Sequence, residues 1–578
     1  MYNQNSGSTN HLNLKANFMQ RKMSKFLMFI FFVFLLSNCD TSDDTVPNPD
    51  PDVAYTLLVE KDVKIKMRDN VSLFANVYRP DAEGKFPVIM TLGPYGKDDL
   101  PAAYDPVDDG NIQVSEYAAF ELPDPAYWVK NGYVVVAVDS RGSGKSPGKT
   151  SLLEEKEAED FYDAIEWGGV QSWSSGNVGI TGVSYYGVSQ WRVAAMNPPH
   201  LKAMMPYEGF TDVYRDGTYH GGISSKFIDG WFNFRILENL SPGNTGYRDL
   251  QSEINQSPLA TASVYKDLDI KSTLSQIKVP AYVAVSLQDH GLHTRGTING
   301  FREIGSSEKW LELFGRKKWE YYYSSDATSR QKMFFDQFLK EEDSGIFGQA
   351  KIRYELREAY YKGDVKTANE WPIANRKLTK MYLDAETMTM DKDLKSDTQT
   401  VSYDASVLED PSQITDTQRV IFRHSFEEDT DIVGSIKLHV FVSSDIADDI
   451  DLFVGIQKED GAGEHVYFQG PAEAAGQVAA GWLRVSHRDL NTSLSTAEIP
   501  FHTHDHVEKI TPNEIVDVEV EIWPTTVRFT KGEKLLLVIQ GNDIVASQEE
   551  HKGILNRGNT RIHTGGAYNS YLQIPVLK

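Results

Sequence analysis

One serine in this chain has the sequence context of a catalytic nucleophile. Ser184 lies in the segment G-V-S-Y-Y-G between Gly182 and Gly187, which follows a short apolar run and precedes an amphipathic stretch. This order of strand, tight turn and helix is that of a nucleophile elbow, which presents a serine hydroxyl at the end of a strand. The elbow strains the backbone at the serine, and the two glycines leave room for strand and helix to approach. The pattern therefore predicts that Ser184 is a nucleophile.

Two further polar residues come directly after segments with the pattern of buried strands. Tyr95 follows the apolar run 86–92, and Asp289 follows the run 280–287. Continuous apolar runs of this length are typical of parallel strands that are covered on both faces. The carboxyl ends of such strands meet at one edge of the sheet, where ligands bind in α/β folds. We therefore expect Tyr95, Ser184 and Asp289 to lie near one another.

Strand, loop and helix patterns alternate over residues 55–350, which predicts an α/β domain with a mostly parallel sheet. The domain begins with a predicted hairpin, residues 63–67 and 71–78. Residues 212–275 are rich in glycine and aromatic residues, and we expect them to form a helical cap over the site; ordinary packing helices are the alternative. Residues 351–578 show short strands with frequent turn signals, which predicts an antiparallel β-sandwich of the jelly-roll type.

The charge balance argues against a nucleic-acid partner. The 578 residues include 82 acidic and 58 basic side chains, a formal net charge of -24, so the chain has no general attraction to phosphate. The segment D-S-R-G-S-G-K-S, from Asp139 to Ser146, imitates a phosphate-binding loop, but the Walker pattern requires glycine where Asp139 stands. We therefore expect no nucleotide site.

Three histidines alternate with other residues in the segment F-H-T-H-D-H, residues 501–506. Imidazoles at alternate positions of a strand face the same side, an arrangement that can bind zinc. No further ligand can be located from the sequence, and a solvated loop is the simpler interpretation. We expect neither a metal nor an organic cofactor.

The N-terminal segment has the pattern of a bacterial lipoprotein signal. Basic residues precede an unbroken apolar run at 26–36, which is far shorter than the roughly 20 residues of a spanning helix. The run ends in L-L-S-N-C, which resembles a lipobox, and Cys39 is the single cysteine of the chain. We predict a signal over residues 1–39, lipidation at Cys39, and an acidic, proline-rich linker over 40–54. A plain signal peptide with a coincidental cysteine is the alternative. The expected location is the bacterial envelope, in the periplasm or on the cell surface.

Together these features resemble the CocE/NonD family of serine hydrolases, which includes cocaine esterases, α-amino-acid ester hydrolases, cephalosporin acylases and, more remotely, Xaa-Pro dipeptidyl-peptidases. The resemblance runs from about residue 55 to the end of the chain and rests on Gly182-x-Ser184-Tyr185-x-Gly187, on Pro94-Tyr95 and on Asp289. It implies an α/β-hydrolase domain followed by a jelly roll. It also implies that Ser184 is the nucleophile, and that the Tyr95 hydroxyl and the backbone N–H of Tyr185 form the oxyanion hole.

The catalytic base is where the chain departs from the family. Family members place the histidine shortly after the strand that follows the acid, here around residues 313–319, and no histidine stands there. A serine hydroxyl needs a base to accept its proton. Because a catalytic triad is defined by geometry and not by chain position, we predict Ser184, Asp289 and His293 as the triad. His290 and His220 are the alternative bases.

Two functions follow from these observations. The first is a lipid-anchored, extracytoplasmic serine hydrolase that cleaves a small ester, an amide or a short peptide through an acyl-enzyme. A dipeptidyl-peptidase would also need a carboxylate for the substrate ammonium, and Glu208, Asp212 and Asp216 are candidates. The second is a catalytically degenerate lipoprotein that binds a glycan or a peptide, for which the missing histidine after Leu313 is the main support. The sequence does not fix the oligomeric state.

Overall fold

The structure, a computed structural model, describes residues 54–99, 112–408, 413–470, 476–544 and 551–578. The predicted signal segment with Cys39, and all of the predicted linker except residue 54, lie outside the described residues. No helix among the described residues is long and apolar enough to cross a membrane.

The first half of the described chain is built on a twisted sheet with a parallel centre. Its strands follow the order β1, β2, β4, β3, β6, β7, β11, β12, β13 and β14, and the pairs from β4 to β13 are parallel. The bounds are β1 (Leu57–Lys66), β2 (Ser72–Pro80), β3 (Phe86–Gly93), β4 (Val134–Asp139), β6 (Ser174–Val183), β7 (Leu201–Tyr207), β11 (Ala281–Ser286), β12 (Lys309–Phe314), β13 (Ile352–Ala359) and β14 (Lys362–Ala368). The predicted hairpin and buried strands are confirmed.

Both faces of the central strands are buried, and successive residues alternate between two hydrophobic cores. In β3, for example, Val88 and Met90 join one core while Ile89 joins the other. The first core contains side chains of α2 (Glu155–Gly169), α3 (Tyr185–Ala195) and α7 (Thr294–Glu303). The second contains side chains of α1 (Pro125–Lys130), α8 (Lys318–Tyr323) and α9 (Ser325–Leu339). This is the α/β-hydrolase arrangement, and it explains why the central strands are continuous apolar runs.

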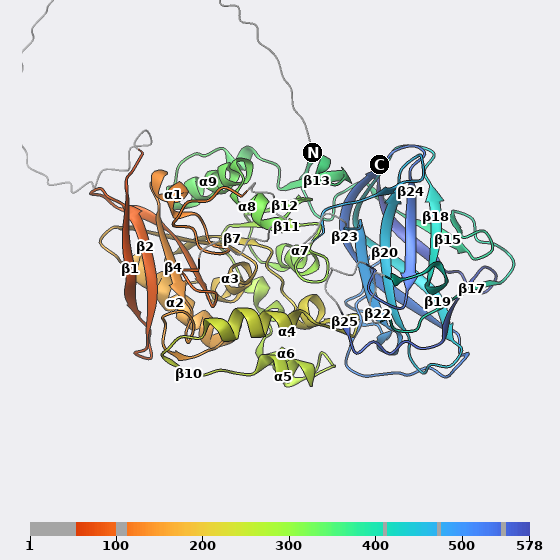
Figure 1. Ribbon diagram of the computed structural model, residues 1–578. Helices are drawn as coiled ribbons and strands as arrows, with labels where there is room; N and C mark the ends of the chain where they lie inside the picture. Colours follow the sequence, from red (N-terminus) through yellow and green to blue (C-terminus); the bar gives the residue numbers. More distant parts are fainter. Residues whose placement is uncertain (1–53, 100–111, 409–412, 471–475, 545–550) are drawn as a thin grey trace, which may run out of the picture. The chain divides into compact units, whose positions relative to one another are not determined.

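Residues 212–275 form an insertion of short helices between the strand β7 and the strand β11 (Figure 1). We call this segment the cap. It contains η3 (Val213–Thr218), β8 (Tyr219–His220), β9 (Ile223–Ser225), α4 (Phe227–Trp231), η4 (Phe232–Ile236), η5 (Leu237–Asn239), β10 (Asn244–Gly246), α5 (Leu250–Asn255), α6 (Ser263–Asp267) and η6 (Lys271–Gln276). Two of these helices, η3 and η4, have π-helical hydrogen bonding. The predicted helical insertion is confirmed.

The C-terminal β domain is an antiparallel assembly that begins at β15 (Arg376–Asp384) and ends at β27 (Tyr571–Leu577). Its longest strands, β19 (Thr430–Ser444) and β23 (Val516–Phe529), pair along most of their length, and β20 (Asp451–Glu459) lies between β22 (Ala479–Arg484) and β24 (Lys534–Gln540). It has a hydrophobic core of its own. The strand β13 pairs with both β12 and β23, so one sheet continues past residue 351 from one half to the other. The predicted boundary at that residue stays a prediction.

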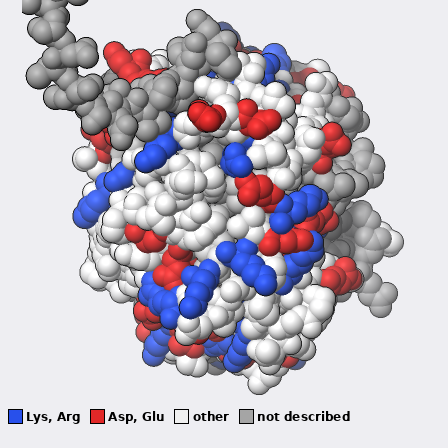
Figure 2. Space-filling model, turned by 90° about the vertical axis from the view of Figure 1, so that its left-hand side faces the viewer, with Lys and Arg blue, Asp and Glu red and all other residues white. Residues whose placement is uncertain are grey.

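Charged side chains of both signs are interspersed on the face shown in Figure 2. Ion pairs among the described residues include Arg68 with Asp163 at 2.7 Å and Arg79 with Glu60 at 2.5 Å. In both pairs a basic side chain has an acidic partner.

Candidate active site

The backbone at Ser184 has the strained geometry of a nucleophile elbow. Ser184 joins β6 to α3 with φ 59° and ψ -118°, a conformation that an L-residue rarely adopts. A Cβ atom on Gly182 would lie 2.4 Å from the Cβ of Tyr186, and one on Gly187 would lie 2.4 Å from the carbonyl oxygen of Tyr207. The two glycines are therefore required by close contacts on both sides of the serine.

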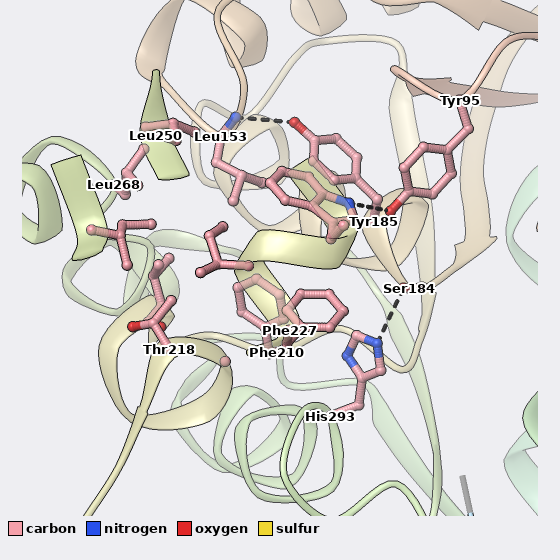
Figure 3. A pocket seen from close by; sticks show the side chains of 15 residues that line it. Tyr95, Leu153, Ser184, Tyr185, Phe210, Thr218, Phe227, Leu250, Leu268 and His293 are labelled. Atoms are coloured by element: carbon pink, nitrogen blue, oxygen red, sulfur yellow. Dashed lines mark hydrogen bonds between the residues drawn. The ribbon is translucent and has the colours of Figure 1, made fainter. Parts of the chain in front are cut away.

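The structure places His293 beside this serine. The Oγ of Ser184 and the Nε2 of His293 are 3.1 Å apart, within hydrogen-bonding distance (Figure 3). His293 is the residue before α7, at the end of a loop that begins with Asp289. The other two candidate bases have different partners: His290 Nδ1 accepts a hydrogen bond from the backbone N–H of Ala480, and His220 Nδ1 lies 2.8 Å from the Nε2 of His551. The geometry therefore favours His293 over both alternatives.

The other ring nitrogen of His293 lacks the hydrogen bond that a triad would supply. Within the described part of the chain, His293 Nδ1 is buried and has no hydrogen-bond partner. The Asp289 carboxylate instead accepts a hydrogen bond of 2.8 Å from the Nζ of Lys318. Asp289 still acts on His293 through its charge. Burial lowers the pKa of His293 to about 3, while the negative charge of Asp289 opposes this effect and the positive charge of Lys318 adds to it.

Lys318 is a functional candidate that the sequence analysis missed. It is the first residue of α8, and it lies in the segment after β12 where a histidine was sought. Its side chain is 13% exposed. Burial alone would lower its pKa, but the carboxylates of Asp289, Glu121 and Glu208 raise the pKa well above its usual value. Lys318 is therefore a largely buried cation. In the sequence, a lysine in the segment where the family places its histidine was the signal for this role.

The carboxylates around Lys318 respond differently to it. Burial raises the pKa of Asp289, but the charges of Lys318 and His293 outweigh burial and the net shift is downward. Glu208 follows β7 and accepts a hydrogen bond from the backbone N–H of Ser286. Burial and the charge of Asp289 raise the pKa of Glu208 well above its usual value. Asp289 is thus the ionised partner of Lys318.

Two hydrogen-bond donors, the backbone N–H of Tyr185 and the hydroxyl of Tyr95, lie close to Ser184. Tyr185 is the first residue of α3, so its backbone N–H has no partner within the helix. The Tyr95 ring packs against the rings of Tyr185 and Tyr186, at centroid distances of 5.7 and 5.6 Å. Its hydroxyl interacts with the Ser184 side chain and accepts a 2.8 Å hydrogen bond from the indole N–H of Trp231. Burial raises the pKa of Tyr95, so the hydroxyl keeps its proton.

An apolar pocket opens beside Ser184 and His293 (Figure 3). Most of its wall comes from the cap. The lining residues are Tyr95, Leu153, Ser184, Tyr185, Phe210, Val213, Gly217, Thr218, Phe227, Ile228, Trp231, Leu250, Ile254, Leu268 and His293. None of these carries a carboxylate. The pocket therefore suits an uncharged, apolar group.

The three carboxylates that were candidates for binding a substrate ammonium do not line this pocket. Asp212 pairs with Arg215 at 3.0 Å, and Asp216 pairs with Arg295 at 2.8 Å. Glu208 belongs to the group around Lys318. The expectation that these residues serve an ammonium site receives no support from their positions.

The expectation that residues 501–506 form a solvated loop is wrong for two of the three histidines. His502 and His504 are 5% and 3% exposed. They are buried because the cap packs against them: Arg215 donates a hydrogen bond to the carbonyl of His502, and the N–H of Ala260 donates one to the carbonyl of His504. His506 is exposed and, with Asp489 and Asp505, forms the one group among the described residues whose spacing could hold a metal ion.

Comparisons with known proteins agree with this architecture. The sequence profile of the X-Pro dipeptidyl-peptidase (S15 family) matches residues 69–317, and that of the X-Pro dipeptidyl-peptidase C-terminal non-catalytic domain matches residues 344–573. The chain is 24% identical over 621 residues to cocaine esterase from Rhodococcus sp. (strain MB1 Bresler), covering 90% of this chain and 99% of that protein.

Two solved structures resemble the chain over most of its length. A CocE/NonD family hydrolase from Staphylococcus aureus has a TM-score of 0.84 and 41% identity, and the match covers 90% of this chain and 94% of that one. An α-amino acid ester hydrolase has a TM-score of 0.69 and 15% identity, and the match covers 93% and 99%. The second likeness shows the fold alone.

Proposed function

The chain belongs to the CocE/NonD family of hydrolases, and from this premise we propose that it is a serine hydrolase that cleaves a carboxylic ester through an acyl-enzyme. Ser184 is the nucleophile and His293 is its base in this proposal. The observation that carries it is the 3.1 Å contact between Ser184 Oγ and His293 Nε2 at a strained elbow. Nucleophile and base must lie within this distance for the proton to transfer.

The chemical steps follow from this contact. Ser184 Oγ attacks the ester carbonyl carbon while its proton moves to His293 Nε2. The tetrahedral intermediate then expels the alcohol, which takes that proton, and leaves the acyl group on Ser184. A water molecule attacks the acyl carbon in the same way, and the acid is released. Because its pKa is lowered to about 3, His293 is neutral at physiological pH and can accept the proton.

The negative charge that develops on the carbonyl oxygen needs donors that are already in place. The backbone N–H of Tyr185 and the hydroxyl of Tyr95 take this role in the proposal. Both lie in a site with little access to water, where such donors are most effective. The Asp289 carboxylate accepts a hydrogen bond from Lys318 and makes none with His293. Its negative charge nevertheless stabilises the imidazolium that forms when His293 accepts the proton.

The pocket favours an ester with an apolar acyl group over a peptide with a free N-terminus. An N-terminal ammonium bound in a dry pocket would need a carboxylate partner, and none of the lining residues has one. The apolar wall instead favours aliphatic or aromatic acyl groups.

We also propose that the protein is anchored to the bacterial envelope by a lipid on Cys39 and acts outside the cytoplasm. The basic segment, apolar run and cysteine of the N-terminus support this location. Replacing Cys39 by serine in the full chain is expected to move the protein from the membrane fraction to the soluble fraction. A variant that stays with the membrane would contradict lipid anchoring.

Hydrolysis of matched chromogenic substrates tests the proposed reaction. The protein is expected to cleave 4-nitrophenyl butyrate or benzoate at least about a hundredfold faster than Gly-Pro-4-nitroanilide. Ser184→Ala should abolish this activity without changing the thermal unfolding temperature. Preference for Gly-Pro-4-nitroanilide would contradict the assigned substrate class. Absence of turnover with either type of substrate would support the alternative of a non-catalytic binding lipoprotein.

A further inference from the structure

A side chain of the cap contacts one of the two proposed donors of the oxyanion hole. Trp231 is the last residue of α4, and its indole N–H donates a 2.8 Å hydrogen bond to the hydroxyl of Tyr95, which follows β3. The two residues are 136 positions apart in the sequence. A dashed line in Figure 3 marks this contact above Ser184.

The chemistry of the two groups fixes the direction of the hydrogen bond. An indole N–H can donate but cannot accept, so the oxygen of Tyr95 must be the acceptor. One lone pair of the phenol is then occupied by Trp231, and the phenolic proton must point to another partner. Tyr95 and Ser184 line the same pocket, so the side of the hydroxyl that Trp231 leaves free can face the reacting carbonyl. Trp231 therefore directs the Tyr95 proton towards the place where the substrate carbonyl oxygen becomes negative.

Two aromatic rings hold the indole in this orientation. Trp231 stacks on Tyr185, with centroids 6.0 Å apart and planes at 17°, and on Phe227, with centroids 6.3 Å apart and planes at 18°. Tyr185 supplies the other donor of the oxyanion hole through its backbone. A single side chain of the cap thus contacts both residues that supply the donors.

The backbone around Trp231 changes its hydrogen-bonding pattern. The α-helix α4 ends at Trp231, and the π-helix η4 begins at Phe232. Short π-helical segments are rare and are frequent at functional sites. The widened turn lies directly after the residue that contacts Tyr95.

We propose that Trp231 is a positioning residue of the oxyanion hole, so that the Tyr95 hydroxyl is oriented for catalysis only when the cap is in place. This inference rests on the proposed function, since it concerns how the same site stabilises the transition state. It predicts that Trp231 contributes to kcat only through its hydrogen bond to the Tyr95 hydroxyl. A role of Trp231 limited to lining the pocket would act on KM.

A double-mutant cycle with Trp231→Phe and Tyr95→Phe separates these roles. Phenylalanine keeps a ring that can stack on Tyr185 but removes the N–H. Trp231→Phe is expected to lower kcat roughly tenfold, with KM changed less than about threefold. Tyr95→Phe is expected to lower kcat roughly a hundredfold, and the Tyr185 N–H keeps this variant measurable. In the Tyr95→Phe background, Trp231→Phe should change kcat less than about twofold.

Phe234→Leu provides a control in the same part of the cap. Phe234 lies in η4, is 68% exposed and does not line the pocket. This variant is expected to leave both kcat and KM within about twofold. Should Trp231→Phe fail to fold, 3-benzothienylalanine at position 231 keeps the bicyclic shape and replaces only the N–H by sulfur.

The outcomes distinguish this inference from the proposed function. Equal losses of kcat from Trp231→Phe in both backgrounds would overturn the positioning role while leaving the serine hydrolase intact. An unchanged kcat in Trp231→Phe would do the same. A wild-type protein that hydrolyses no ester would overturn the proposed function, and this inference would fall with it.

Discussion

His293 combines two properties that are in tension in a catalytic base. It lies 3.1 Å from the serine that it must deprotonate, yet its surroundings are unfavourable to the imidazolium that forms when it does so. Burial is the largest cause, and the charge of Lys318 adds to it. Asp289 is the group that opposes both effects. The balance of these three influences determines the pH range in which the base is neutral.

The first prediction concerns the pH dependence of the wild-type activity. A lowered pKa means that the neutral base persists to lower pH than in an ordinary histidine, whose pKa is about 6.5. The pKa of His293 is lowered to about 3. The value of kcat/KM for a neutral ester should therefore stay nearly constant from pH 8 down to about pH 5. A half-maximal loss near pH 6.5 would contradict the surroundings that we describe for this residue.

The second prediction concerns Lys318. Its positive charge lowers the pKa of His293, so Lys318→Met should raise that pKa and move the acidic limb of the kcat/KM profile to higher pH. The substitution also leaves Asp289 without its cation, and we expect a loss of about 3 to 5 kcal/mol of stability. Lys332→Met is the control, because Lys332 pairs with Asp336 on α9. A folded Lys318→Met variant with an unmoved acidic limb would refute the electrostatic role.

At the scale of elements, the elbow positions the serine by bringing β6, α3 and β7 together. The contacts of Gly187 show how little space remains, since a Cβ there would meet a backbone carbonyl of β7. Backbone atoms cannot move aside as the end of a flexible side chain can. The exact orientation of Ser184 therefore depends on the absence of a single methyl group.

The third prediction uses this contact. Gly187→Ala should destabilise the protein by about 1 to 3 kcal/mol and should lower kcat, because β7 or α3 must shift. Gly230→Ala in α4 is the matched control, since a Cβ at Gly230 meets nothing within 4 Å. Alanine in that helix should leave stability unchanged or raise it by up to about 1 kcal/mol. Equal effects of both substitutions in chemical denaturation would rule out the steric explanation.

The sequence predicted the elements better than their contacts. Long apolar runs and the glycine spacing were enough for the central strands, for the elbow and for the insertion of the cap. The contact of His293 with Ser184 was only one of three possibilities, because it depends on how the loop after Asp289 turns. The partners of Lys318 and Trp231 are 29 and 136 residues away, so the sequence does not show these contacts, although the position of Lys318 after β12 was a signal. Burial of His502 and His504 depends on the cap in the same way.

At the scale of the whole described molecule, the β domain supports the loop that carries His293. Arg295 lies in the first turn of α7, and its guanidinium bonds Asp216 of the cap at 2.8 Å and Glu521 of β23 at 3.0 Å. On the same loop, His290 accepts a hydrogen bond from Ala480 of β22. The candidate base is thus held between the cap and the β domain, and we therefore expect contacts of the β domain to affect kcat.

The fourth prediction tests this support. Glu521→Ala removes one of the two carboxylates of Arg295, and we expect a loss of about 2 kcal/mol of stability and a several-fold decrease in kcat. Glu519→Ala is the control, because Glu519 lies two positions away on β23 and pairs with Lys437 inside the β domain. Glu519→Ala should leave kcat unchanged. Similar decreases of kcat in both variants would mean that the effect is a general weakening of the β domain.

The central claim is that Ser184 is a nucleophile activated by His293, and labelling with a fluorophosphonate tests it most directly. The wild-type protein should gain one phosphonyl group, which peptide mapping by mass spectrometry should locate on Ser184. Ser184→Ala should gain none, and His293→Ala should be labelled at least about a hundredfold more slowly. A wild-type protein that stays unlabelled, or that is labelled at another residue, would contradict the account.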